Sequence, residues 1–183
     1  VNFYAGLSKS FGEKLSADVS LAAEQYHTDM WNEWSLYPVA NLTYLPAPGH
    51  ILQFSLSSDK EYPEYWSMQN STSYMGAYSE IQGNPFLKPA TNYETTLSYI
   101  LKGKYVLSAY YSRTKNKEMQ TLYQSPERLV EIYKCFNFDF SEQAGLVMVV
   151  PFKVKKWLDS RVTAIGFRYR QKDSDFWDIP FDR

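Results

Sequence analysis

The chain has 183 residues and a formal net charge of −1, so it is long enough for one domain and carries no excess charge that would attract nucleic acid. Aromatic residues make up 17% of the sequence, and tyrosine, the most frequent of them, suits positions between an apolar surface and water. The single cysteine and the two histidines exclude a disulfide framework, and we expect no metal site and no cofactor. The sequence also lacks a run of about eighteen apolar residues, so no transmembrane helix is expected.

Alternation of apolar and polar residues predicts β-strands along most of the chain. Between Leu15 and Glu24, apolar side chains stand at every second position, whereas a helix needs spacings of three and four. The predicted strands are Asn2–Phe11, Leu15–Glu24, Leu36–Leu45, Ile51–Ser58, Asn92–Leu101, Tyr105–Gln124, Leu129–Phe152 and Asp159–Gln171. No helix is predicted. The expected fold is therefore all-β, an antiparallel up-and-down meander of about eight strands that forms either a segment of a β-barrel or a small barrel.

The connections between the predicted strands alternate in length. Short turns are expected at 12–13, 46–49, 102–104 and 153–157, with longer connections at 27–34, at 59–91 and after Gln171, and a short one at 125–128. In an up-and-down meander every second connection emerges at the same end. Short turns at one end and long loops at the other are typical of outer-membrane barrels. A soluble sandwich has no reason to keep this alternation.

The segment 59–91 has no apolar periodicity over some thirty residues, and loops of that length are usually functional or disordered. It is rich in aromatic residues, and further tryptophans occur in the predicted loop 27–34. Aromatic faces can stack on sugars or on apolar ligands. The alternative is that these side chains hold the loops to one another or to a barrel rim. The candidate ligand-binding residues are Trp31, Trp34, Tyr62, Tyr65 and Trp66.

The stretch Gly83–Glu94 joins this irregular segment to a strand. Asn84-Pro85 is a turn pair, and Pro89 fixes the backbone just before the alternation begins. The stretch resembles the glycine-asparagine-proline-x-leucine-lysine-proline segment in the barrel of TonB-dependent outer-membrane receptors. Residues 97–116 and 137–157 resemble hairpins of the Bacteroidetes-type outer-membrane barrel family, so the resemblance covers about half the chain.

The resemblance implies a barrel of roughly twenty-two strands in the outer membrane of a Gram-negative cell, plugged by an N-terminal domain. Such receptors are not enzymes; they import a small nutrient ligand with energy relayed by the TonB system. Residues 1–183 are then expected to form a single barrel segment, a fragment of a larger receptor without the plug domain. The partners implied are outer-membrane lipid, TonB acting through the missing plug, and an unidentified nutrient. Open strand edges invite self-association of an isolated fragment.

A soluble all-β module that binds a ligand or a carbohydrate is the alternative, either a lectin-like sandwich or a small lipocalin-like barrel. The two hypotheses differ in which face of the strands is apolar. A receptor barrel needs apolar residues outside and polar residues inside, whereas a soluble module needs the reverse. Ser16, Asp18, Ser20 and Glu24 fit a wet interior and an outer surface equally well, so the sequence leaves both hypotheses open.

Overall fold

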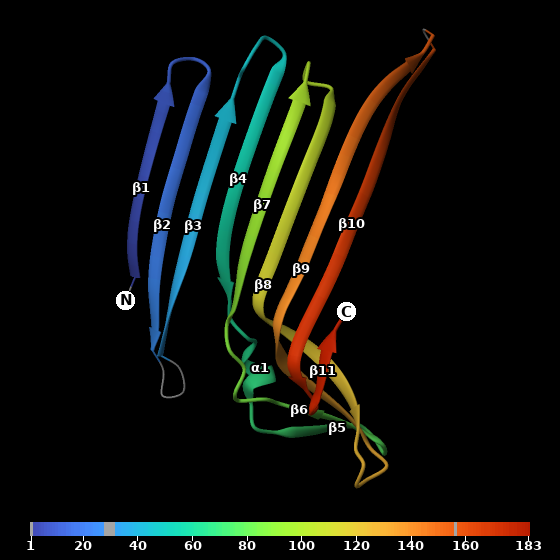
Figure 1. Cartoon of the computed structure of the whole chain (residues 1–183). Coiled ribbons are helices and arrows are strands. Elements are labelled where there is room, and N and C mark those ends of the chain that lie inside the picture. Colours follow the sequence, from blue (N-terminus) through green and yellow to red (C-terminus); the bar gives the residue numbers. More distant parts are fainter. Residues whose placement is uncertain (1, 28–31, 156) are drawn as a thin grey trace. The chain divides into compact units, whose positions relative to one another are not determined.

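The computed structural model describes residues 2–27, 32–155 and 157–183, which form an eleven-stranded sheet and one short helix (Figure 1). The elements are β1 (Asn2–Phe11), β2 (Leu15–His27), β3 (Asn32–Tyr44), β4 (His50–Glu61), α1 (Tyr65–Met68), β5 (Thr72–Gly76), β6 (Ser79–Gln82), β7 (Ala90–Leu101), β8 (Tyr105–Gln124), β9 (Glu131–Val154), β10 (Leu158–Phe176) and β11 (Ile179–Asp182). The predicted all-β antiparallel meander is confirmed.

Hydrogen-bonded neighbours follow the order β1-β2-β3-β4-β7-β8-β9-β10-β11, so most strands pair with the next strand in the chain. The short hairpin of β5 and β6 is set aside from this path, and β6 pairs with β9 in parallel, from Ser79 opposite Glu131 to Gln82 opposite Lys134. Within the described residues β1 and β11 are the two ends of the order and do not pair with each other. The sheet is therefore open, as expected for a barrel segment.

The structure divides into two compact units. Unit 1 comprises residues 1–59, 93–113 and 142–169, and unit 2 comprises residues 60–92, 114–141 and 170–183. The strands of unit 1 lie side by side, and the short turns 12–14, 45–49 and 102–104 lie at the same end of them, as the alternation of connection lengths predicts (Figure 1).

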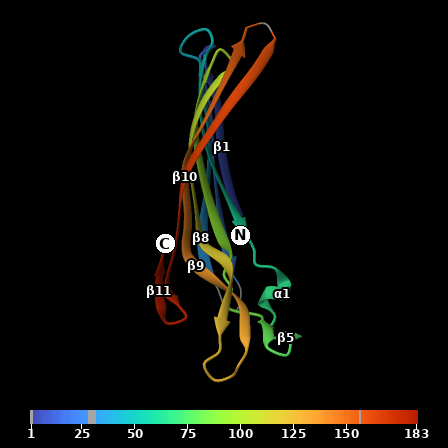
Figure 2. The ribbon, with the colours of Figure 1, turned by 90° about the vertical axis from the view of Figure 1, so that its right-hand side faces the viewer.

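Unit 2 has a core of its own. The fully buried apolar side chains of the described residues all belong to unit 2: Leu87, Ala90, Ile132, Cys135 and Phe138. Unit 1 is instead a single layer of strands (Figure 2), with large apolar side chains exposed along it. The two units therefore differ: unit 2 buries a small set of apolar side chains by internal packing, whereas no apolar side chain in the described part of unit 1 is buried.

The prediction that residues 59–91 are irregular is wrong in part, because this segment contains α1, β5 and β6. The prediction of no helix is also wrong, since α1 makes one turn in which the Ser67 amide donates to the Glu64 carbonyl at 3.1 Å. Elements of four or five residues are too short to show a hydrophobic period.

Two further boundaries differ from the expectation. The segment after Gln171 was expected to be a loop, but β10 runs on to Phe176 and turns into β11. The third strand begins at Asn32 rather than Leu36, because its first residues pair with β2 despite having no apolar alternation. The remainder of the connection predicted at 27–34, residues 28–31, lies outside the described residues.

Candidate functional site

The register of the strands in unit 1 fixes an apolar face. Residues directly opposite each other on neighbouring strands share one face of a sheet. Successive rows on this face run through Leu7, Val19, Ala40 and Leu56, through Lys9, Ala17, Leu42 and Phe54, and through Phe11, Leu15, Tyr44 and Leu52. Leu7 is 84% exposed and Val19 is 52% exposed. Phe11, Tyr44 and Leu52 in these rows are also exposed, and the remaining apolar side chains of the rows are partly exposed.

The opposite face of unit 1 is polar. Its rows run through Ser8, Asp18, Asn41 and Ser55 and through Ser10, Ser16, Thr43 and Gln53. A cleft of about 230 Å³ on this face brings Thr96 and Ser98 beside these rows. The Ser98 and Ser108 hydroxyls are hydrogen-bonded at 2.7 Å, so the polar face extends across β7 and β8. The sheet therefore has one largely apolar face and one polar face, and within the described part of unit 1 neither is covered by a second layer of strands.

The aromatic residues predicted to bind a ligand are solvent-exposed wherever the structure describes them. In unit 2, Tyr65 and Trp66 of α1 are 81% and 53% exposed, and Tyr62 is 49% exposed. Only Ser67 of α1 is buried, so the helix turn is attached through Ser67 and leaves both aromatic rings in solvent. The Trp66 indole N–H donates to the Glu64 carboxylate.

Trp34 belongs to unit 1, where its ring stacks on Phe3 at a centroid distance of 6.4 Å and an interplanar angle of 17°. It remains 56% exposed. Trp31 lies outside the described residues. The structure therefore groups Tyr62, Tyr65 and Trp66 on one short segment and places Trp34 in the other unit.

The motif Gly83–Glu94 is clamped by two asparagines. The Asn84 side chain donates to the Cys135 carbonyl at 2.9 Å and accepts from the Phe86 amide at 3.1 Å, which closes the turn before Pro85. Asn137 accepts from the Lys88 amide at 2.7 Å and donates back to the Lys88 carbonyl at 2.9 Å. The same amide group also donates to the Asn116 carbonyl at 2.8 Å. The motif thus ties the end of the long segment to β8 and β9, a structural role that the residue types alone do not reveal.

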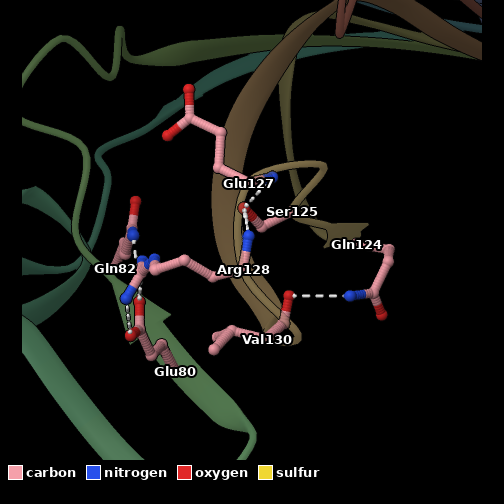
Figure 3. Close-up of polar contacts among 7 residues, drawn as sticks. All are labelled: Glu80, Gln82, Gln124, Ser125, Glu127, Arg128 and Val130. Atoms are coloured by element: carbon pink, nitrogen blue, oxygen red, sulfur yellow. Dashed lines mark hydrogen bonds and ion pairs between the residues drawn. The ribbon is translucent and has the colours of Figure 1, made fainter.

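An ion pair between a half-exposed arginine and a buried glutamate joins the β8–β9 turn to the β5–β6 hairpin (Figure 3). The Arg128 guanidinium donates to both carboxylate oxygens of Glu80, at 2.9 and 3.2 Å, and Glu80 is only 3% exposed. These hydrogen bonds hold the pKa of the Glu80 carboxyl below its ordinary value. Within the turn, the Ser125 hydroxyl accepts from the amides of Glu127 and Arg128, both at 3.3 Å.

An aromatic cluster in unit 2 was not predicted. Trp177 stacks on Tyr123 with centroids 4.0 Å apart, and Phe138, Phe176 and Phe181 meet pairwise at 5.5 to 5.8 Å. The only sequence signal is the concentration of aromatic residues around Trp177, which is uninformative until β10 and β11 are known to fold back over β8 and β9.

Groups of three or more metal-ligating side chains do not occur among the described residues. Within the same residues, no helix is long and apolar enough to cross a bilayer.

Residues 2–179 match the model of a protein family described as the outer membrane protein beta-barrel family. This chain is a member of that family. No curated protein sequence matches the chain.

Solved structures of an outer-membrane receptor share the fold of this outer-membrane barrel chain. The ferric enterobactin receptor of Pseudomonas aeruginosa in complex with enterobactin, as a substituted variant, is 15% identical with a TM-score of 0.62; the alignment covers 99% of this chain and 31% of the receptor. The same receptor in complex with BCV-L6 gives the same values. Another variant of it is 14% identical with a TM-score of 0.60 and equal coverage. The chain spans less than a third of these receptors.

The family match confirms the expected identification as an outer-membrane β-barrel chain, and the solved receptors share its fold. The soluble module is accordingly set aside. The exposed apolar face of this outer-membrane barrel chain agrees with that location, because a soluble sheet would have to cover it.

Proposed function

We propose that unit 1 forms part of the wall of a receptor barrel, with its apolar rows against lipid and its polar rows toward the interior. The complete receptor binds a small nutrient ligand at the cell surface and imports it with energy from the TonB system, relayed through a plug domain in the rest of the protein. Residues 1–183 act in this proposal as a single barrel segment. Produced alone, the chain exposes the edge of β1, and pairing with another copy is expected.

The observation that carries this proposal is the two-faced sheet of unit 1. Burial of apolar surface stabilises a protein by about 25 cal/mol per Å², so leaving the rows that contain Leu7 and Phe11 in water is unfavourable. The hydrocarbon of a bilayer would bury these side chains. About 9–11 tilted residues cross the hydrocarbon layer, and β1, with 10 residues, is already long enough. In lipid the backbone groups of each strand must be paired, as the continuous antiparallel pairing of β1 to β4 provides.

We assign ligand contact to Trp31, Trp34, Tyr62, Tyr65 and Trp66. Exposure of Tyr65 and Trp66 on a turn anchored by Ser67 supports this assignment, since their rings are held in place without being used in the core. Large aromatic side chains give much contact area for little loss of conformational entropy. The solved receptors of the same fold bind enterobactin, so we propose a ferric siderophore as the nutrient.

Uptake of iron-labelled ferric enterobactin tests this function. Cells that lack other receptors for it and express the complete protein should accumulate the label, and removal of TonB should abolish accumulation. Replacing both Tyr65 and Trp66 by alanine should lower uptake at least ten-fold, because two aromatic contacts are lost.

The matched control is Tyr78→Ala, since Tyr78 is also exposed in unit 2 but is outside the proposed set. It should leave uptake unchanged. Uptake that persists without TonB contradicts the transport mechanism, and absence of uptake by the unaltered protein excludes ferric enterobactin as its ligand.

A further inference from the structure

Unit 2 contains a cleft on the side of the β8–β9 ribbon away from α1. Figure 2 shows β11 on one side of this ribbon and α1 with β5 on the other. The cleft has a volume of about 670 Å³, within the range of small-molecule sites. Its lining includes Leu122, Tyr123, Trp177, Ile179, Phe181 and Arg183.

Trp177 and Tyr123 contribute a stacked aromatic pair to the lining of the cleft. Their rings stack at 4.0 Å with an interplanar angle of 10°. Phe136 contacts Trp177 edge-on at 4.9 Å, and the Lys134 ammonium lies 5.5 Å from the Phe136 ring on the same strand. The indole therefore has packed neighbours that fix its orientation.

The backbone at Trp177 is strained. Trp177 and Asp178 have φ values of 49° and 63° and form the two-residue turn between the paired residues Phe176 and Ile179. A turn with two positive φ values favours Asn-Gly, and a bulky residue in that region is an outlier. Such strain is characteristic of functional positions.

The charge offered by the cleft is positive. Asp182 is engaged by Arg170, which donates to its two carboxylate oxygens at 2.8 and 2.7 Å, and these bonds hold the pKa of Asp182 below its ordinary value. Arg183 also lines the cleft, and among the described residues no acidic side chain pairs with it. The cationic charge of Arg183 is therefore left for a ligand.

We propose that this cleft binds a small planar aromatic anion, with its ring against the aromatic surface that the Trp177–Tyr123 stack presents to the cleft and its anionic group at Arg183. An aromatic surface favours contact with another ring, and the charge of Arg183 complements an anion. The site is distinct from the aromatic residues around α1, so its test does not depend on the function proposed for them.

Naphthalene-2-sulfonate is the probe, with cyclohexanesulfonate as the non-planar control of equal charge. Binding is measured by saturation-transfer NMR on the complete protein in detergent micelles, with empty micelles subtracted. We expect the naphthyl probe to bind at least ten-fold more tightly than the cyclohexyl control. Tyr123→Leu should weaken naphthyl binding at least five-fold, and Arg183→Gln should weaken it about five-fold. Tyr74→Leu, an exposed tyrosine outside the cleft, should leave it unchanged.

The decisive variant combines Trp177→Asn with Asp178→Gly, which gives the turn its preferred residues and removes the indole. Amide exchange across Gln171–Arg183, whose backbones pair at 2.6 and 3.0 Å, reports whether the β10–β11 hairpin stays formed. Loss of probe binding with a formed hairpin supports the proposal. Unchanged binding overturns it, as does equal binding of the two sulfonates or no binding to the unaltered protein. If the hairpin opens in the double variant, the Tyr123→Leu variant is the test instead. Weaker naphthyl binding by that variant supports the proposal, and unchanged binding overturns it.

Discussion

Gly83, at the start of the Asn-Pro motif, lies against the backbone of another segment. A Cβ added at this residue would overlap the Gln69 carbonyl, and the Gly83 amide donates to the Ser71 carbonyl at 3.0 Å. The next amide, that of Asn84, donates to the Ser67 carbonyl at 2.6 Å. The glycine is therefore required by the close approach of the α1 segment, and its φ is not in the left-handed region.

Gly83→Ala should destabilise the packing of this segment by about 1–3 kcal/mol, because the clash is with backbone that cannot rotate away. Hydrogen exchange at the Asn84 amide should accelerate roughly ten-fold or more. Gly76→Ala is the matched control, since a Cβ there meets nothing within 4 Å. Equal exchange rates at the Asn84 amide in the two variants would show that the segment shifts without cost to accommodate a methyl group at Gly83.

At the scale of elements, unit 2 is assembled by contacts between segments remote in sequence. The Glu80–Arg128 pair joins residues 48 positions apart, and the Asn137–Lys88 pair joins residues 49 apart. Each pair closes a connection onto a strand. The ionised Glu80 carboxylate helps to hold the turn 125–130 on the β5–β6 hairpin, next to the backbone hydrogen bond from the Glu131 amide to the Tyr78 carbonyl.

Acid should therefore release this turn. Because the folded pKa of Glu80 is lowered from its ordinary value of 4.5, its contribution to stability is complete above that value and is lost as the pH falls through the folded pKa. Hydrogen exchange of the amides of residues 125–130, corrected for intrinsic rates, should accelerate below about pH 4.5. Glu80→Gln should remove this transition and leave the turn exchanging fast at every pH.

The neighbouring carboxylate of Glu127 provides the control for this pH effect. Its side chain points away from Arg128 in Figure 3, and only its backbone amide is bonded in the turn. Glu127→Gln should preserve the transition. A turn that stays protected well below the ordinary pKa of a glutamate in the unaltered chain would show that the ion pair does not hold it.

At the scale of the whole molecule, the two units differ in how they place their apolar side chains. Unit 1 has faces of opposite polarity and no buried apolar side chain among its described residues, whereas unit 2 has its own small core. The first arrangement fits the proposed contact of unit 1 with lipid.

Adjacent cysteines on β7 test which face meets lipid. Ser98 lies on the polar face and Leu97 on the opposite one, where it is 46% exposed. With the complete protein in outer membranes, a water-soluble maleimide should label Ser98→Cys at least ten-fold faster than Leu97→Cys, and a lipid-soluble reagent should reverse the order.

The unaltered protein serves as the labelling control. Burial and the neighbouring Glu118 raise the pKa of the Cys135 thiol to about 11, so it is protonated at neutral pH and reacts slowly. Equal labelling of both engineered cysteines by the water-soluble reagent would place both faces in water and contradict the barrel-wall assignment.

The long strands could be predicted from the sequence because their alternation records an environment that differs between two faces. Leu15–Glu24 and Tyr105–Gln124 show this directly, and their predicted ranges agree closely with β2 and β8. The outer-membrane family could likewise be predicted from the sequence, because the Asn-Pro motif is a short run of consecutive residues. The candidate ligand residues could be named, but only as exposed aromatics, and their contact with a ligand stays a prediction.

Other features were decided only by tertiary structure. The elements α1, β5, β6 and β11 are too short to leave a period, and each is held by partners distant in sequence. The stack of Trp177 on Tyr123 depends on β10 and β11 folding back over β8 and β9. Alternation determined that the strands have two faces, because it is a property of neighbouring residues. Which strands pair, and in which register their residues share a face, depends on contacts between distant segments, and only the folded structure decided it.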